Sequence, residues 1–330
     1  MDREELIALI KSSPREQFDH IAIHLFQYQY KYNSIYREWV DNLKVLPSEV
    51  REISDIPFLP ISAFKHHKVH CKKVEEQVIF TSSGTTGSTI SKHYVFDLNF
   101  YLDNASQIFK EFYGPVEDYC ILALLPSYLE RNGSSLVAMV DYFIRRSKYA
   151  ESGFFLYNHS ELFSRLEQCK RENIPTILFG VSFALLDFIE NRELSFPELM
   201  VMETGGMKGR KKEMTREDLH DKLSRGFGVE HVHSEYGMTE LFSQAYSKEL
   251  GVFVPGGTMK VIIKDISDPL SEQAHSKSGV INIIDLANID SCAFIETQDL
   301  GVRYADGSFE ILGRLDVSDI RGCNLMVADV

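Results

Sequence analysis

The chain has 330 residues, of which 44% are hydrophobic and 25% are charged, a composition typical of folded globular proteins. Its 48 acidic and 35 basic residues give a formal net charge of −13, which disfavours binding to nucleic acid or anionic membranes. The five cysteines show no paired spacing, the charged N-terminus does not resemble a signal peptide, and no apolar run reaches the roughly 20 residues that span a bilayer. We therefore expect a cytoplasmic protein with no membrane span and no nucleic-acid partner.

The first segment, residues 1–75, is expected to be a helical lead-in. Apolar or aromatic residues recur every three or four positions from Phe18 to Leu43, the spacing of one helix face. Prolines at positions 47, 57 and 60 then interrupt this pattern. The segment therefore predicts core-packing helices followed by an irregular connector.

Residues 76–250 alternate short β-branched or aromatic runs with amphipathic stretches. This alternation is typical of crossover connections in a mainly parallel sheet flanked by helices. The expected strands are Val78–Thr81, Cys120–Leu125, Phe154–Tyr157, Thr176–Phe179, Leu199–Met202 and Glu230–His233. The expected helices are Leu98–Tyr113, Leu136–Arg146, Ser160–Arg171 and Arg216–Leu223.

Residues 251–312 show strand patterns without helices between them. The expected strands, separated by Gly, Asp and Ser, are Met259–Ile263, Val280–Ile284, Ala293–Glu296 and Phe309–Leu312. They predict a smaller antiparallel sheet or barrel, and residues 313–330 follow it as a hinge-like tail. The fold class is therefore α/β, with a second, antiparallel β part near the C-terminus.

A loop rich in serine, threonine and glycine follows the first strand of residues 76–250. Its glycines allow a tight turn and close approach to a ligand, and its exposed N–H groups suit an anion. The loop does not match the Walker A pattern, because Gly84 and Gly87 are three positions apart and no lysine follows. Taken alone, it is either a phosphate-binding loop or a flexible linker.

Two further segments carry polar side chains near the ends of expected strands. After the strand that is expected to end at His233 come an aromatic residue for stacking, Tyr236, and the oxygen ligands of Thr239 and Glu240, which suit phosphate and Mg²⁺. Further on, Asp299 is placed to accept from a ribose hydroxyl, and Arg314 offers a rigid cationic fork. Taken alone, the first segment could equally be a helix cap, and the others surface turns.

In this order, the Ser/Thr/Gly loop, Tyr-Gly-x-Thr-Glu, Thr-x-Asp and Gly-Arg-x-Asp resemble the signature of the adenylate-forming superfamily of acyl-CoA ligases, luciferases and adenylation domains. The resemblance covers about Val78 to Asn324 and implies the fold of the large N-terminal domain of those enzymes. It also implies ATP and Mg²⁺ as cofactors and a small-molecule carboxylic acid as substrate. In that chemistry the acid attacks the α-phosphorus of ATP and forms an acyl-adenylate.

The resemblance implies a role for each matching residue. Thr239 would contact the α-phosphate, Glu240 would hold Mg²⁺, and Tyr236, with its neighbour Gly237, would lie against adenine. The remaining nucleotide-binding residues would be the phosphate cradle Ser82, Ser83, Gly84, Thr85, Thr86 and Gly87, the adenine-slot glycines Gly205 and Gly206, and the ribose ligands Asp299 and Arg314.

Within the superfamily, the chain is similar to phenylacetate–CoA ligases and, more closely, to the acyl-protein synthetases of bacterial luminescence (LuxE type). The cues are Ile-Pro-Phe-Leu-Pro-Ile-Ser-Ala-Phe-Lys at 56–65, Pro-Ser-Tyr-Leu-Glu-Arg at 126–131, Gly-Ser-Ser-Leu at 133–136 and Arg-Gly-Cys-Asn-Leu-Met at 321–326. The chain departs from the superfamily in two ways: no lysine stands two residues after the loop's last glycine, and no counterpart of the C-terminal lid domain, with its catalytic lysine, is expected. Acyl-protein synthetases are similarly short.

This subfamily implies that a fatty acyl group passes to Cys323, and from there to an acyl-reductase or acyl-carrier partner protein. A buried, inert Cys323 is the other interpretation of that position. Two other functions stay open. One is an acyl- or aryl-CoA ligase whose lid comes from another chain, and the other is a non-catalytic nucleotide-binding scaffold. The presence of Glu240, Asp299 and Arg314 argues against the scaffold.

Overall fold

The computed structural model describes residues 1–12, 15–71, 75–82, 89–126, 133–190, 192, 194–205, 214–266 and 272–315. The helices are α1 (Arg3–Ser12), α2 (Phe18–Tyr32), α3 (Ser34–Asn42), α4 (Ala63–His66), α5 (Leu98–Tyr113), α7 (Ser135–Arg146), α8 (His159–Arg171), α9 (Ser182–Ile189) and α10 (Arg216–Phe227). The first strands are β1 (Leu59–Pro60), β2 (Val78–Thr81), β3 (Lys92–Val95), β4 (Cys120–Leu124), β5 (Gly153–Phe155), β6 (Thr176–Val181) and β7 (Met200–Thr204). The others are β8 (Val232–Tyr236), β9 (Ala245–Ser247), β10 (Val252–Pro255), β11 (Met259–Lys264), β12 (Ser278–Asp285), β13 (Phe294–Arg303) and β14 (Phe309–Arg314).

Twelve of the described strands form one sheet, in the order β11-β12-β13-β14-β10-β9-β8-β7-β6-β4-β5, with β1 paired to β13. Strands β5, β4, β6, β7 and β8 are parallel, and the pairs from β8 to β11 are antiparallel. Strands β2 and β3 form a separate hairpin. This mixed α/β architecture confirms the expected fold class, and the antiparallel part is joined to the parallel part through β9 and β10.

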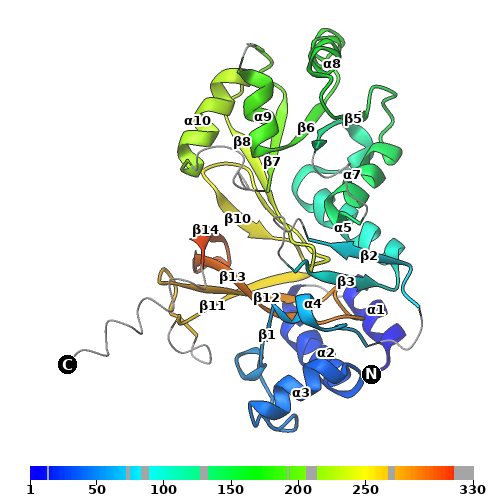
Figure 1. Cartoon of the computed structure of the whole chain (residues 1–330), viewed down its shortest axis with the longest axis vertical. Helices are drawn as coiled ribbons and strands as arrows, with labels where there is room; N and C mark the ends of the chain where they lie inside the picture. Colours follow the sequence, from blue (N-terminus) through cyan, green and yellow to red (C-terminus); the bar gives the residue numbers. More distant parts are fainter. Residues whose placement is uncertain are drawn as a thin grey trace, which may run out of the picture.

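Helices lie on both sides of the parallel strands, as crossover connections require (Figure 1). Helices α5 and α7 lie on one side and α9 and α10 on the other, while α1 to α3 gather beside the antiparallel strands. Strand β4 is buried along its whole length, because helices cover both of its faces. The parallel strands therefore end at an edge near the middle of the molecule, above the antiparallel part.

Local sequence patterns predicted two elements to the residue. Strand β2 and helix α5 have the expected bounds, and α5 begins where the Asp97 side chain accepts a hydrogen bond from the Phe100 backbone N–H (3.0 Å). The apolar stripe from Phe18, in contrast, belongs to two helices. Asn33 is extended between them, and its side chain caps α3 by accepting from the backbone N–H of Tyr36.

Two strand bounds that bear on the functional segments differ from the prediction. We predicted that a strand would end at His233, but β8 continues to Tyr236, because Ser234 and Glu235 are buried in the sheet despite their polarity. We also predicted that Asp299 would lie at a strand end, but it lies inside β13, at the start of the half that pairs with β14. Tyr236 and Asp299 are therefore held by sheet hydrogen bonds, more rigidly than loop residues.

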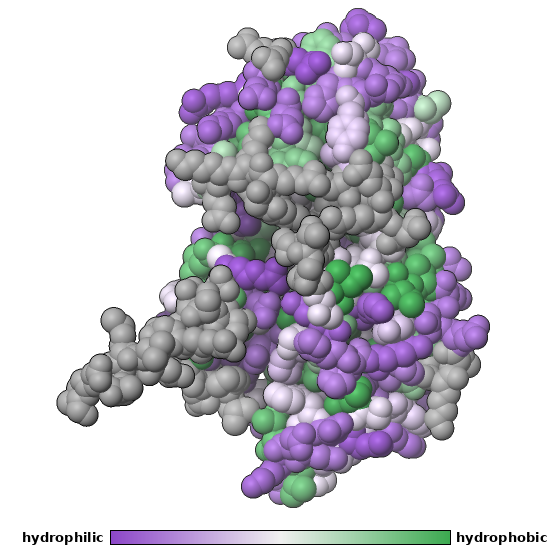
Figure 2. Space-filling view, viewed as in Figure 1, coloured by the Kyte–Doolittle hydropathy of each residue, from purple (hydrophilic) through white to green (hydrophobic). Residues whose placement is uncertain are grey.

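Hydrophilic side chains dominate the upper and lower ends of the face in Figure 2, and hydrophobic side chains gather at mid-height. The buried core runs through all parts of the sheet and includes large side chains such as Tyr36, Tyr101, Phe109 and Phe253. Within the described ranges, no helix has the length and apolarity that crossing a membrane requires.

Candidate active site

Two glycines mark the carboxyl ends of neighbouring parallel strands. Gly205 follows β7, Gly237 follows β8, and both are exposed. Gly205 has φ of +66°, a conformation that favours glycine, and its carbonyl oxygen accepts a hydrogen bond from the Ser182 hydroxyl (2.6 Å). The carboxyl edge of a parallel sheet is where open α/β folds bind ligands, so these glycines leave backbone open to a ligand there.

The base of the Ser/Thr/Gly loop is closed by Ser82 and Ser91. The Ser82 backbone N–H donates to the Ser91 carbonyl (3.1 Å), and the Ser91 N–H donates to the Ser82 hydroxyl (2.9 Å). Just before this base, the Thr81 N–H donates to the carbonyl of Gly133 (2.7 Å). Gly133 has φ of +86°, and a Cβ there would lie 2.7 Å from the Ile79 carbonyl oxygen, so the approach requires glycine. Hydrogen bonds therefore hold Ser82 and Ser91, on the two sides of the loop, next to each other.

The Thr239–Glu240 segment is held from behind by His93 of β3 and by Asn288. His93 Nδ1 donates to the Thr239 carbonyl (2.8 Å), and its Nε2 lies 3.0 Å from Asn288 Oδ1. The Asn288 amide in turn donates to the Glu240 carbonyl (2.7 Å). Burial lowers the pKa of His93 to about 4. The imidazole of His93 and the amide of Asn288 thus fix two consecutive carbonyls and set the direction of the Thr239 and Glu240 side chains.

A buried carboxylate, Asp285, anchors the residues that follow Glu240. It accepts hydrogen bonds from the backbone N–H groups of Phe242 (2.6 Å) and Ser243 (3.0 Å) and from the Ser243 hydroxyl (2.6 Å). Because one carboxylate replaces several backbone partners, this turn needs no helix or strand to satisfy its N–H groups.

Tyr236 connects the second functional segment to the third. The buried Tyr236 hydroxyl donates to Asp299 Oδ2 (3.0 Å). Asp299 in turn lies opposite Arg314 in the antiparallel register of β13 and β14. Arg314 is exposed and donates to Gln298 Oε1 (3.3 Å). An aromatic ring, a carboxylate and a guanidinium are thus presented together, a set suited to a base and a sugar hydroxyl.

The two carboxyl groups of this site, those of Glu240 and Asp299, are affected more by burial than by the positive charges nearby. Burial raises the pKa of Glu240, and the rise is opposed by a side-chain hydrogen bond from Ser91 and by the charges of Arg314 and Lys65. Burial also raises the pKa of Asp299, against the charge of Arg314 and the Tyr236 hydrogen bond. Both carboxyls would therefore gain from an added cation. The Ser91–Glu240 contact places the carboxylate of Glu240 beside the loop base.

The structure thus brings together Ser82, Gly205, Tyr236, Gly237, Thr239, Glu240, Asp299 and Arg314 at the edge of β7 and β8. The other predicted site residues, Ser83, Gly84, Thr85, Thr86, Gly87, Gly206 and Cys323, lie outside the described residues. Sequence reasoning missed His93, Asn288 and Asp285. These are single polar residues whose role depends on contacts with distant segments, so no local pattern signals them.

The donor set at Glu240 fits Mg²⁺ bound together with phosphate. In the part of the chain that the structure describes, no group of three or more His, Cys, Asp or Glu side chains could enclose a metal. Mg²⁺ is commonly bound by one or two carboxylates plus substrate phosphates, and Glu240 offers one carboxylate beside Ser91, at the base of the Ser/Thr/Gly loop.

Comparison with known proteins places the chain in a family. The family model described as "Acyl-protein synthetase, LuxE" matches residues 7–330. Among curated proteins, none matches the chain.

Solved structures that are similar to this chain include acyl-CoA ligases. A 2-hydroxyisobutyryl-CoA ligase with 2-HIB-AMP and CoA has a TM-score of 0.70 at 14% identity, and the match covers 94% of this chain and 71% of that chain. ATP-bound MatB from Rhodopseudomonas palustris has a TM-score of 0.55 at 18% identity, and the match covers 72% of this chain and 47% of that chain. A long-chain-fatty-acid-CoA ligase from Archaeoglobus fulgidus, FadD1, has a TM-score of 0.52 at 16% identity, and the match covers 76% of this chain and 53% of that chain. The chain thus spans about half the length of the last two.

Proposed function

Because the chain belongs to the LuxE family of acyl-protein synthetases and is an ATP-dependent ligase, we propose that it adenylates a fatty acid, passes the acyl group to Cys323, and delivers it to a partner protein in the cytoplasm. The observation that carries this proposal is the convergence of the loop base, the Thr239–Glu240 turn and the Tyr236–Asp299 pair at one sheet edge. Each element offers groups for a different part of ATP.

In the proposed first step, a carboxylate oxygen of the acid attacks the α-phosphorus of ATP and pyrophosphate leaves. The task of the protein is to align two anions and offset their charge. The loop that starts at Ser82 would hold the β- and γ-phosphates, and Thr239 would contact the α-phosphate. Arg314 and Lys65 are the cations whose charges act on Glu240, so they supply positive potential at the same place.

The nucleoside would lie across the ends of β7 and β8. Gly205, with Gly206, would line the adenine slot, and Tyr236 would lie against the base. Asp299 would accept from a ribose hydroxyl, and its second oxygen is occupied by the Tyr236 hydroxyl. That hydrogen bond supports the ribose assignment, because it fixes the carboxylate in one orientation before the nucleotide arrives.

Glu240 is the residue that would hold Mg²⁺. The ion, when bound, offsets the charge of the triphosphate and so favours attack by an anion. Burial of Glu240 supports this role, because a carboxyl whose pKa is raised in the free protein regains full charge beside a dication.

In the proposed second step, the thiolate of Cys323 attacks the acyl carbon. A C–S bond forms, the bond from the acyl carbon to the phosphate oxygen breaks, and AMP leaves. The other four cysteines, Cys71, Cys120, Cys169 and Cys292, are buried, which makes each a poor acceptor. The acyl group then passes from the thioester to a reductase or carrier protein.

Acid-dependent exchange of pyrophosphate into ATP tests the first step. The purified protein with ATP and Mg²⁺ is assayed with acids from acetate to palmitate and with aryl acids, with CoA left out and then added. Exchange that requires an acid but not CoA supports the proposal. Absence of exchange with every acid would favour a nucleotide-binding scaffold, and product formation only with CoA would favour a CoA ligase.

A further inference from the structure

A group of polar side chains lies buried on one face of β8 and β9. The register pairs Glu235 with Tyr246 and Tyr236 with Ala245, so Gly237 and Gln244 oppose each other at the next position. Side chains alternate along a strand, and Glu235, Gln244 and Tyr246 therefore share a face. Rings of α5 cover this face: Phe112 lies 5.3 Å from the Tyr246 ring, and Tyr113 lies 5.4 Å from it.

Two polar atoms of this group have no hydrogen-bond partner in the described part of the chain, Gln244 Oε1 and the Tyr246 hydroxyl. Gln244 is 3% exposed and Tyr246 is 1% exposed. The Gln244 Nε2 atom is occupied, because it donates to the Phe242 carbonyl (3.2 Å), and this leaves Oε1 as the unused acceptor. An unpaired buried polar group costs about 1–3 kcal/mol, so each of these two atoms calls for a partner that the described chain does not supply.

Glu235 places this group directly behind the nucleotide site. Its Oε2 accepts from the Thr204 hydroxyl (2.5 Å), and Thr204 immediately precedes Gly205. Its Oε1 faces Gly237: a Cβ at Gly237 would lie 2.5 Å from Oε1 and 3.8 Å from Gln244 Cγ. Burial raises the pKa of Glu235 to about 7, and the neighbouring carboxylate of Glu203 adds to the rise. Glu235 therefore lies two residues before Gly237 and contacts the residue that precedes Gly205.

We propose that Glu235, Gln244 and Tyr246 bind a hydrogen-bond donor, a hydroxyl or amino group, on the acid that is adenylated. This inference rests on the proposed function and narrows its substrate from a plain fatty acid to one that carries such a group. Gln244 Oε1 and Glu235 are acceptors, and the Tyr246 hydroxyl can accept as well. An unsubstituted chain at this position would leave the buried acceptors unpaired, and sites of this kind reject such analogues.

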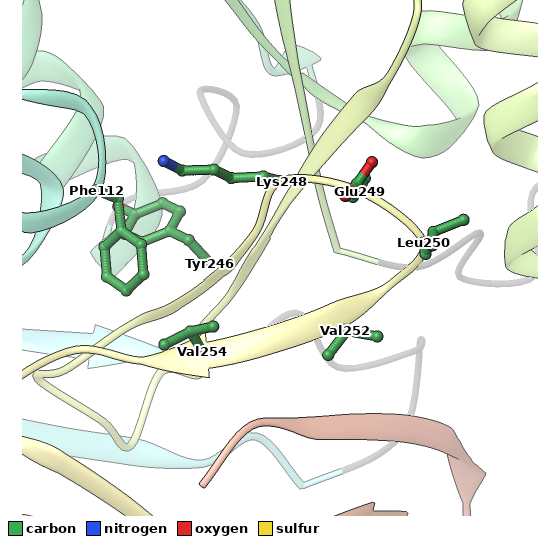
Figure 3. A pocket seen from close by; sticks show the side chains of 7 residues that line it. All are labelled: Phe112, Tyr246, Lys248, Glu249, Leu250, Val252 and Val254. Atoms are coloured by element: carbon green, nitrogen blue, oxygen red, sulfur yellow. The ribbon is translucent and has the colours of Figure 1, made fainter. Parts of the chain in front are cut away.

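A pocket of about 440 Å³ lies beside Tyr246 (Figure 3). Its apolar lining comes from Phe112, Leu250, Val252 and Val254, and the charged residues Lys248 and Glu249 complete it. In Figure 3 the rings of Phe112 and Tyr246 lie side by side, and the two valines project from β10 below them. A volume of this size is within the range of small-molecule sites, so the test uses acids with an eight-carbon chain.

The test compares pyrophosphate exchange by the full chain with octanoate, 2-hydroxyoctanoate, 3-hydroxyoctanoate and 3-aminooctanoate. We expect kcat/KM to be at least about 10-fold higher for one of the substituted acids, and the amino and hydroxy acids identify the donor. Tyr246→Phe and Gln244→Met should each reduce this preference several-fold. Tyr113→Phe, which removes a hydroxyl that contacts His233 in the same aromatic group, should retain it.

Equal kcat/KM for octanoate and all substituted acids would overturn the inference, as would a preference that survives in both variants. Loss of exchange with every acid would count against the proposed function instead. In that case, calorimetric titration measures binding of the same acids without requiring the adenylation reaction, and so tests the inference separately. Tighter binding of a substituted acid to the parent than to Tyr246→Phe supports it, and equal binding overturns it.

Discussion

The hydroxyl of Tyr236 donates a hydrogen bond to Asp299 Oδ2 over 3.0 Å, although the two residues are 63 positions apart in the chain. Tyr236 ends the last strand of the parallel part, and Asp299 lies in the antiparallel part. The contact therefore joins the two parts of the sheet at the proposed nucleoside site. It also makes the orientation of Asp299 depend on a residue of another strand.

This relationship predicts graded effects on ATP binding. Asp299→Ala should weaken binding by about 1.5–3 kcal/mol, the range for a hydrogen bond to a charged group, or roughly 10- to 100-fold in Kd. Tyr236→Phe keeps the ring and the carboxylate, so it should weaken binding by about 0.5–1.5 kcal/mol. Isothermal titration calorimetry measures both. An unchanged Kd for Asp299→Ala would rule out the ribose role.

Glu240 gives a prediction that separates chemistry from folding. Glu240→Ala should abolish pyrophosphate exchange, because the proposed Mg²⁺ ligand beside the loop is lost. The fold should survive, since the backbone of this turn is held by His93 and Asn288 rather than by the Glu240 side chain. Exchange assays and thermal melts measure the two effects.

The matched control is Glu38→Ala, which removes an exposed carboxylate from α3. It should leave both exchange and the melting temperature unchanged. Full exchange activity in Glu240→Ala would contradict the assignment, and a collapsed melting curve in that variant would show that Glu240 supports the fold instead.

The sequence predicted those parts of the fold that depend on neighbouring residues. Helix α5 has a clear apolar face and an Asp97 cap, and both can be seen in the sequence. The end of β8 could not be predicted, because Ser234 and Glu235 look exposed in the sequence and are buried only by helices from other segments. Asp299 lies within a strand for a similar reason: the length of β13 depends on its pairing with β14.

The candidate site was predicted through its motifs and not through its supports. Tyr236, Glu240 and Asp299 stand in recognisable patterns, whereas His93 and Asn288 are isolated residues 195 positions apart that meet only in the fold. The buried Gln244 and Tyr246 atoms also require the structure, because whether a polar atom has a partner is a tertiary property. Motifs therefore indicated the candidate groups, and the fold showed which residues hold them in place.

Glu235 predicts a pH dependence of stability. Its folded pKa of about 7 lies above the ordinary value of 4.5, so the folded state binds its proton more tightly than the unfolded state. Its contribution is therefore fully present below about pH 4.5 and is lost as the pH rises through 7. At 1.36 kcal/mol per pKa unit, this amounts to at most about 3 kcal/mol.

Glu235→Gln keeps the shape and cannot ionise, so it should gain stability relative to the parent between pH 5 and pH 8. Urea unfolding at several pH values measures the difference in free energy of unfolding between the two proteins. The expected difference grows with pH in favour of the variant. A constant difference across this range would show that Glu235 ionises freely in the folded protein.

Intact-mass spectrometry shows whether the protein makes an acyl-adenylate and transfers the acyl group to its own thiol. The parent, incubated with ATP, Mg²⁺ and an acid that supports exchange, should gain the mass of one acyl group, and neutral hydroxylamine should remove it as expected of a thioester. Cys323→Ser should lose the label but retain exchange, because the two half-reactions use different groups. A label that persists in Cys323→Ser, or a parent that exchanges pyrophosphate yet gains no acyl mass with any such acid, would contradict the account.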